Sequence, residues 1–222
     1  MSLASATFGA GGAEPYASAL RGGELLYLSD TRARSTTRVT MDVSRWNADA
    51  DAADLTLLSR VTGPVLDIGC GPGRMVRAAL NLGMHAVGVD VSAAALEIAG
   101  KLGGSFITGS VFDRVPGEGM WQTTLLVDGN VGIGGDIPSL LARCRELLSS
   151  SGEIVVELNA DSGHQEHYFA EVVDSHGNRS DSFPWAEIGL DRLCIMLDHL
   201  GLELIQSWAL DGRAFCRLAK TR

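Results

Sequence analysis

The stretch VLDIGCGPGR, residues 65–74, decides the fold of this chain. Its first four residues, 65–68, are mostly apolar and predict a short buried strand. Three glycines at alternate positions follow, and a helical pattern begins at Arg74. Glycines let the backbone turn tightly and let a ligand approach where a Cβ would clash, and the N-terminus of the next helix adds unpaired N–H groups. The stretch therefore predicts a strand–loop–helix unit that binds a ligand.

Strand and helix patterns alternate on the C-terminal side of this stretch. Alternation of this kind predicts a doubly wound α/β fold, a mostly parallel sheet with helices on both faces. The expected strands are 85–89, 105–108, 123–127 and 153–158, and the expected helices are 74–82, 92–102, 138–148 and 185–200. Asp211-Gly212, between two apolar runs at 202–210 and 214–218, predicts a C-terminal antiparallel hairpin.

The chain of 222 residues is expected to form one domain with an elaborated N-terminal end. Residues 1–13 are rich in Gly, Ala and Ser and are interpreted as a disordered leader. Residues 14–60 are too few for an independent core, so we expect them to cap the ligand edge of the sheet formed by residues 61–222.

Composition narrows the class of protein. Hydrophobic residues make up 45% of the chain, charged residues 20%, and the formal net charge is −9. The acidic balance argues against a nucleic acid or an anionic membrane as the main partner, and no apolar run is long enough for a membrane span. Four widely spaced cysteines predict neither a disulfide framework nor a zinc site. A cytoplasmic location fits best.

The details of the glycine loop restrict the ligand. Arg74 stands where a dinucleotide-binding loop has its third glycine, and Pro72 removes an N–H group that would hold pyrophosphate. Asp67 lies inside the first strand and suits a cationic group, while Asp90 ends the next strand, a position suited to both hydroxyls of a ribose. These features together predict a nucleoside without phosphates that carries a charged amino-acid tail.

At this point the sequence resembles the class I S-adenosylmethionine-dependent methyltransferases. Residues 66–73 are similar to the first motif of that family and residues 87–92 to the second, and the resemblance extends over about Val61 to Leu218. It implies a seven-stranded, Rossmann-like sheet with S-adenosyl-L-methionine as cofactor. The methionine part would contact Asp67 and the loop residues Gly69, Cys70, Gly71 and Gly73, and the ribose would contact Asp90 beside Val91.

The adenine contacts depart from the family pattern. The acidic residue that reads the adenine amino group in the family is replaced by Ser110. Asp113 could substitute for it, and Val111 or Phe112 could pack on the adenine ring.

A second glycine-rich loop follows the expected strand at 123–127. Ligands of open α/β sheets bind outside the carboxyl ends of the strands, where this loop emerges beside the first. In the family this place faces the transferring methyl group, so Asp128 and Asn130 are candidates for catalysis, and Asp128 also for cofactor binding. We interpret Asp136 as the cap of the helix that begins near Pro138.

The remaining candidates lie on the acceptor side. His164 and His167 follow the last parallel strand and could take a proton from an acceptor, although surface histidines without a role are commoner. The spacing of His164, Glu166 and His167 matches no strong metal motif, and we predict no metal. Two aromatic segments could close over the ligands or simply pack in the core: Arg45-Trp46 and Phe183-Pro184-Trp185.

The sequence thus predicts an enzyme that transfers a methyl group in line from S-adenosylmethionine to an oxygen or nitrogen atom of a small molecule. The expected partners are this small molecule and no nucleic acid or membrane, and the possible assemblies include a homodimer. Two alternatives stay open: a cofactor-binding module without turnover, and a nicotinamide-dependent oxidoreductase, against which Pro72 and Arg74 count.

Overall fold

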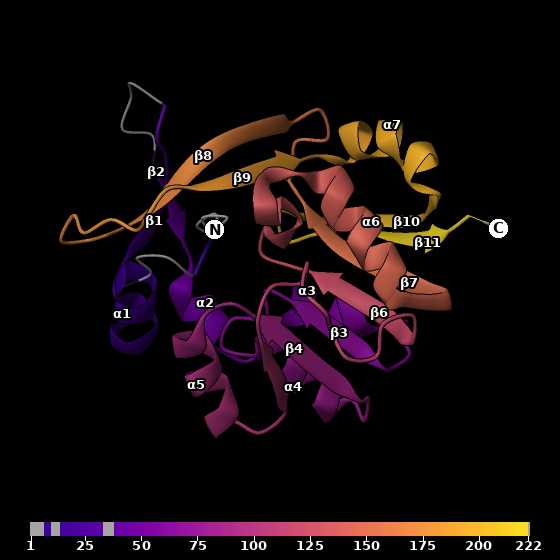
Figure 1. Ribbon diagram of the computed structural model, residues 1–222, viewed down its shortest axis with the longest axis horizontal. Coiled ribbons are helices and arrows are strands. Elements are labelled where there is room, and N and C mark those ends of the chain that lie inside the picture. The colour runs from indigo at the N-terminus through magenta and orange to yellow at the C-terminus, as the bar shows by residue number, and fades with distance from the viewer. Residues whose placement is uncertain (1–6, 10–13, 33–37, 222) are drawn as a thin grey trace.

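The computed structural model describes residues 7–9, 14–32 and 38–221 (Figure 1). Its main sheet has seven strands in the order β10-β11-β7-β6-β3-β4-β5. Neighbours from β7 to β5 run parallel, and β10 and β11 run antiparallel at the other edge. The strands are β3 (Val65–Ile68), β4 (Ala86–Asp90), β5 (Ser105–Thr108), β6 (Trp121–Leu126), β7 (Leu148–Leu158), β10 (Leu202–Leu210) and β11 (Arg213–Lys220). The predicted doubly wound seven-stranded fold with its C-terminal hairpin is confirmed.

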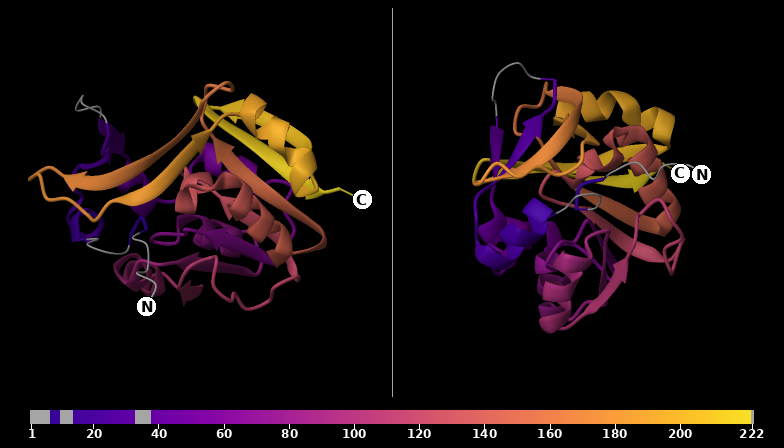
Figure 2. Two further views of the ribbon diagram at one scale, coloured as in Figure 1. Left: turned by 45° about the horizontal axis from the view of Figure 1, so that its top comes forward. Right: turned by 60° about the vertical axis from the view of Figure 1, so that its left-hand side comes forward.

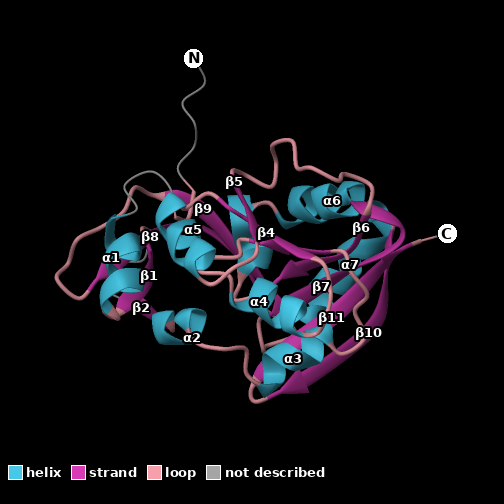
Figure 3. Ribbon diagram, turned by 90° about the horizontal axis from the view of Figure 1, so that it is seen from below, coloured by secondary structure: helices cyan, strands magenta, loops and turns pink. Residues whose placement is uncertain are grey.

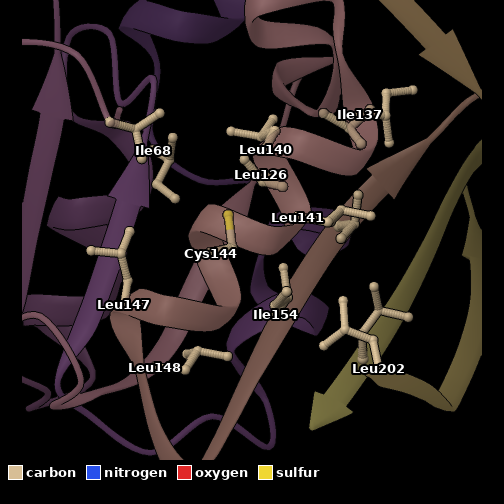
Figure 4. Packing of buried hydrophobic residues seen from close by; sticks show 14 of the residues in the cluster. Ile68, Leu126, Ile137, Leu140, Leu141, Cys144, Leu147, Leu148, Ile154 and Leu202 are labelled. Atoms are coloured by element: carbon tan, nitrogen blue, oxygen red, sulfur yellow. The ribbon is translucent and has the colours of Figure 1, made fainter. Parts of the chain in front are cut away.

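Helices cover both faces of this sheet because its strands bury side chains on each side. Leu66 and Ile68 of β3 pack with α6 (Ile137–Leu147) and α7 (Leu190–Leu200) on one face. Figure 4 shows the leucines of α6 above the strands on this face. Val65, the alternate residue, packs with the helices of the other face, which are α3 (Ala52–Leu58), α4 (Arg74–Asn81) and α5 (Ala93–Lys101).

Local signals in the sequence set the helix ends. The Ser92 hydroxyl accepts a hydrogen bond from the Ala95 N–H and caps α5, as predicted. The Asp136 carboxylate accepts from the Ser139 N–H and caps α6, so this residue has the structural role that we expected. Of the four cysteines, Cys70, Cys144 and Cys216 are buried and free, and Cys194 is exposed and free.

A second, antiparallel sheet lies beside the main one, in the order β2-β1-β8-β9 (Figure 2). Its strands are β1 (Leu26–Asp30), β2 (Arg38–Met41), β8 (Gln165–Asp174) and β9 (Phe183–Ile188). The N-terminal segment supplies two of them, together with α1 (Glu14–Gly22) and α2 (Val43–Asn47), which lie next to this sheet in Figure 3. An insertion between β7 and α7 supplies the other two. The cap is therefore built from two segments that are far apart in sequence.

This second sheet corrects two sequence predictions. The helix expected over 185–200 is wrong in its first part, because residues 183–188 form β9 and the helix begins only at Leu190. The segment that contains His167, for which no strand was predicted, is strand β8. Strand β8 pairs with β1, which lies more than a hundred residues earlier, and β9 pairs with β8.

The leader expected over residues 1–13 falls outside the described residues except for 7–9. There the Phe8 ring packs edge-on against Tyr16, Trp46 and Phe183. Among the helices that the structure describes, none is long and apolar enough to cross a membrane.

The packing between the two sheets gives a first prediction. η1 (Asn130–Gly135) lies against β9, and a Cβ on Gly132 would lie 2.1 Å from the Ala186 carbonyl oxygen. The carbonyl belongs to the backbone and the position of a Cβ is fixed by it, so neither can rotate away, and Gly132→Ala must push β9 away from the loop. We expect a loss of about 1–3 kcal/mol in the free energy of unfolding, measured in urea.

Gly100→Ala is the matched control. Gly100 lies in α5, and a Cβ there would meet nothing within 4 Å. Alanine should therefore stabilise the helix by about 0.5–1 kcal/mol. Equal stabilities of the two variants would contradict the packing between η1 and β9.

Candidate functional site

A cavity of about 630 Å³ opens at the carboxyl ends of β3, β4 and β6. The chain passes from β3 to β4 and β5 on one side and returns to β6 on the other, so this is the point where the strand order reverses. Open α/β sheets bind their ligands at such a crevice. Residues of the cap close the cavity from above, because Tyr16 of α1, Trp46 of α2 and Trp185 of β9 also line it.

The glycine loop has the backbone that its sequence predicts. Gly69, Gly71 and Gly73 have φ values of 69°, 52° and 85°, in the left-handed region that favours glycine. Gly73 is the N-cap of α4 and offers no side chain to its first N–H groups, which leaves them free for an anionic ligand group. Gly69 and Gly71 line the cavity, whereas Gly73 does not.

Asn130 joins the two loops at the crevice. Its side-chain Nδ2 donates hydrogen bonds of 2.9 Å to the carbonyl oxygens of both Ile68 and Gly69. A Cβ on Gly69 would lie 2.8 Å from the same nitrogen, so the approach requires glycine there. Asn130 lines the cavity, and these contacts show that it positions the glycine loop.

Two buried carboxylates face the cavity. Asp67 is 3% exposed, and no described residue donates a hydrogen bond to its side chain. Burial raises the pKa of this carboxyl to about 7, against the attraction of the Arg74 guanidinium. Asp90 accepts from the N–H groups of Gly71 at 2.8 Å and Ser92 at 2.7 Å. Burial raises the pKa of Asp90 as well, and these hydrogen bonds oppose the increase.

A network of ion pairs lies beside the cavity. Asp54 of α3 is 0% exposed, and its Oδ1 accepts from Arg45 and Arg213, each at 2.8 Å. Arg74 NH1 lies 3.1 Å from Asp54 Oδ2, but this nitrogen is buried without a hydrogen-bond partner. The three arginines come from α2, α4 and β11, so one carboxylate connects the cap to both edges of the crevice.

Asp128 belongs to the same network. Its Oδ1 accepts from Arg45 NH1 at 2.9 Å and its Oδ2 accepts from Arg74. Its φ of 58° is left-handed, a conformation that costs a non-glycine residue about 1–2 kcal/mol. The Glu157 carboxylate fixes this turn by accepting from the Asp128 N–H at 2.7 Å. Burial raises the pKa of Asp128, and the charge of Arg74 opposes the shift.

The structure brings most of the predicted site residues together. Those that line the cavity are Asp67, Gly69, Cys70, Gly71, Asp90, Val91, Ser110, Val111, Asp128 and Asn130. Asp113 and Phe112 also line it, although the Asp113 carboxylate accepts from the Ser110 N–H at 3.3 Å within its own turn. The predicted methyltransferase motifs and the second loop therefore converge on one cavity.

The two histidines lie elsewhere. A second cavity of about 280 Å³ shares Met41, Trp46, Asp128 and Trp185 with the first, and neither His164 nor His167 lines either cavity. His164 Nε2 lies 3.2 Å from the Glu187 carboxylate, behind the second cavity. His167 is exposed on β8. Among the described residues, the side chains grouped closely enough to hold a metal are Glu24, Asp174 and His176, which line neither cavity.

Sequence reasoning missed several cavity residues, among them Tyr16, Met41 and Arg74. Tyr16 is 4% exposed, and burial together with the negative charge of Asp90 raises the pKa of its hydroxyl. Met41 reaches the cavity from β2. Arg74 also lines the cavity, but the sequence analysis used it only as evidence against a dinucleotide-binding loop, which has a glycine at that position. Nothing local marks Tyr16 or Met41, because α1 packs against the distant strand β8 and β2 joins β8 through β1. Arg74 could have been found from its position at the first turn of α4, facing Asp67.

Arg45, next to Trp46, is bound to carboxylates of the chain itself. Its guanidinium contacts Asp51, Asp54 and Asp128. Trp46 is half-buried and lines both cavities, so it does close over the crevice.

Comparisons with known proteins agree with this geometry. A family model described as a methyltransferase domain matches residues 65–152. No sequence among the curated proteins matches significantly.

Solved structures share the fold over most of the chain. A SAM-dependent methyltransferase from Bacteroides fragilis, in complex with S-adenosyl-L-homocysteine, is similar with a TM-score of 0.72 and 17% identity, over 94% of this chain and 93% of that one. The CcbJ methyltransferase from Streptomyces caelestis has a TM-score of 0.59 and 17% identity, over 77% and 88%. A Burkholderia thailandensis 1,6-didemethyltoxoflavin-N1-methyltransferase has a TM-score of 0.59 and 18% identity, over 80% and 81%.

The matched segment contains β3 to β6, both glycine loops and the carboxylates of the crevice, and the shared fold extends over the cap and the C-terminal hairpin. Residues 65–152 therefore match a methyltransferase domain, and the chain shares its fold with solved SAM-dependent methyltransferases.

Proposed function

We propose that this enzyme transfers the methyl group of S-adenosylmethionine to a nitrogen or oxygen atom of a small molecule. The observation that carries the proposal is the Asp67 carboxylate, buried at the cavity with no hydrogen-bond donor among the described residues. A buried charge without a partner is costly, so a cationic ligand group would stabilise it. S-adenosylmethionine carries such a group, its α-ammonium.

The other residues of the cavity fit the remaining parts of this cofactor. Arg74 NH1, buried without a hydrogen-bond partner, and the uncapped N-terminus of α4 suit the carboxylate of the methionine part. The free lone pairs of Asp90 suit the ribose hydroxyls, and Val91 and Val111 offer apolar surface to the adenine. When bound, the cofactor supplies an electrophilic methyl group on a sulfonium.

The protein's own contribution to this reaction would be positioning. Asp128, Trp46 and Trp185 line both cavities and so lie at the boundary between cofactor and acceptor. Arg45 and Arg74 hold the Asp128 carboxylate from both sides, which fixes it as a polar wall of the methyl path. Holding two reactants in line can supply much of the rate enhancement of such a transfer.

The size of the second cavity favours a small molecule. This cavity has a volume of about 280 Å³ and lies between the main sheet and the cap, a space that suits an acceptor of modest size. A similar solved structure holds 1,6-didemethyltoxoflavin, a small molecule, together with S-adenosylhomocysteine. Both observations support an acceptor of modest size.

The proposal predicts a specific effect at Asp90. Asp90→Asn removes an acceptor of ribose hydrogen bonds, worth about 1–3 kcal/mol at a buried site. The Kd for S-adenosylhomocysteine, measured by isothermal titration calorimetry, should rise about 10–100-fold. Asp136→Asn, at an exposed helix cap outside both cavities, makes the same chemical change and should leave the Kd unaltered. Equal affinities of the two variants would contradict the proposed site.

Asp67 predicts a dependence of stability on pH. Its pKa rises from 3.8 to about 7 on folding, so the ionised carboxylate destabilises the free protein increasingly as pH rises from about 4 to 7, and constantly above that. Asp67→Asn removes this penalty. At pH 8 the melting temperature of the ligand-free variant should therefore be several °C above that of the wild type, since each kcal/mol of stability shifts it by roughly 2–4 °C. At pH 5 the difference in melting temperature should be smaller.

The same variant should bind S-adenosylhomocysteine more weakly, because the amide carries no charge for the ammonium group. If Asp67→Asn is more stable and binds S-adenosylhomocysteine more weakly, the carboxylate serves ligand binding and does not stabilise the fold. A variant that melts below the wild type at pH 8 would show that Asp67 stabilises the fold instead.

A further inference from the structure

The second cavity is distinct from the cofactor cavity but adjoins it. It lies between β2 and α2 of the cap on one side and β9 and the carboxyl end of β7 on the other. Met41, Trp46, Asp128 and Trp185 line both cavities. A molecule in the second cavity would therefore lie next to the place where, by the proposed function, the methyl group is presented.

Negative side chains outnumber positive ones among the described residues that line this cavity. Among the described residues that line it, four carry a carboxylate and one, Arg45, is cationic; the carboxylates are those of Asp42, Asp128, Glu157 and Glu187. Most of these charges are already matched. Arg45 and Arg74 hold Asp128, and Arg213 holds Glu157 through two hydrogen bonds of 2.7 Å. Asp42 is exposed at the rim and caps α2.

Glu187 differs from Asp128 and Glu157, which have arginine partners, and from Asp42, which is exposed at the rim. Its described partners are the Tyr168 hydroxyl at 2.6 Å, the Asn159 amide at 3.1 Å and His164 Nε2 at 3.2 Å, with no lysine or arginine among them. These groups orient the carboxylate at the cavity wall. They do not supply the permanent positive charge that arginine gives to Asp128 and Glu157.

We propose that the second cavity binds the methyl acceptor through a protonated amine, with Glu187 as the counter-ion. The indoles of Trp46 and Trp185 at the boundary add aromatic surface, which attracts a cation. The inference rests on the proposed function and makes it narrower, because the acceptor becomes a small molecule that carries an amine. An anionic acceptor would meet four carboxylates and a single arginine that is already bound to three of the chain's own.

Three small probes of similar shape test this inference directly: benzylamine, benzyl alcohol and benzoate. Each is titrated by NMR into the full chain, first free and then loaded with S-adenosylhomocysteine. We expect benzylamine to bind at least about tenfold more tightly than benzyl alcohol, and benzoate to bind most weakly, since a charge-assisted hydrogen bond is worth about 1.5–3 kcal/mol. Equal affinities, or a preference for benzoate, would overturn the proposal.

Two variants locate the effect. Glu187→Gln keeps the shape and an acceptor oxygen for Tyr168, and it should reduce the affinity for benzylamine to that for benzyl alcohol with the Kd for S-adenosylhomocysteine unchanged. Glu166→Gln is the matched control, because Glu166 pairs with Glu187 across β8 and β9 but is exposed and lines neither cavity. The two variants change the net charge equally. An equal loss in both would assign the preference to the overall charge and contradict a site at Glu187.

The outcomes separate this inference from the proposed function. If S-adenosylhomocysteine fails to bind while the free chain still prefers benzylamine, the proposed function is wrong and the cation site stands. If S-adenosylhomocysteine binds and the three probes bind alike, the cation site is wrong and the proposed function stands. If Glu187→Gln does not fold, the ranking of the three probes by their affinity for the wild-type protein still tests the cation site.

Discussion

The buried carboxylate of Asp54 is the constraint on which the rest of the site depends. A fully buried charge must be paired, and here Arg45, Arg74 and Arg213 approach it from α2, α4 and β11. Removing one partner of a buried pair typically costs about 3–5 kcal/mol, so these elements are held in fixed positions. The same arginines reach Asp128, and the network thereby sets the wall between the two cavities.

The two sheets contribute different residues to the site. The main sheet supplies the parts that suit a nucleoside with an amino-acid tail: the glycine loop, Asp67 and Asp90. The second sheet supplies aromatic side chains and Glu187, which face the acceptor side. On the proposed function, cofactor recognition would rest on a local strand–loop–helix unit, whereas acceptor recognition would rest on pairing between segments that are distant in sequence.

The same division explains what the sequence could predict. The strand at 65–68, the glycine loop and the cap at Ser92 are local, so the strands and helices of the main sheet and most residues of the first cavity could be predicted from short patterns. The second sheet did not, because β8 pairs with β1 across more than a hundred residues and its exposed, polar beginning is typical of a loop. The roles of Tyr16, Met41 and Glu187 arise only from that pairing.

On the proposed function, the crevice binds a nucleoside with a cationic amino-acid tail and no phosphates. Calorimetric titration of the wild-type chain with S-adenosylmethionine, S-adenosylhomocysteine and NADH tests this most directly. We expect both sulfur compounds to bind at one site per chain and NADH to give no binding heat. Binding of NADH without binding of the sulfur compounds would contradict it.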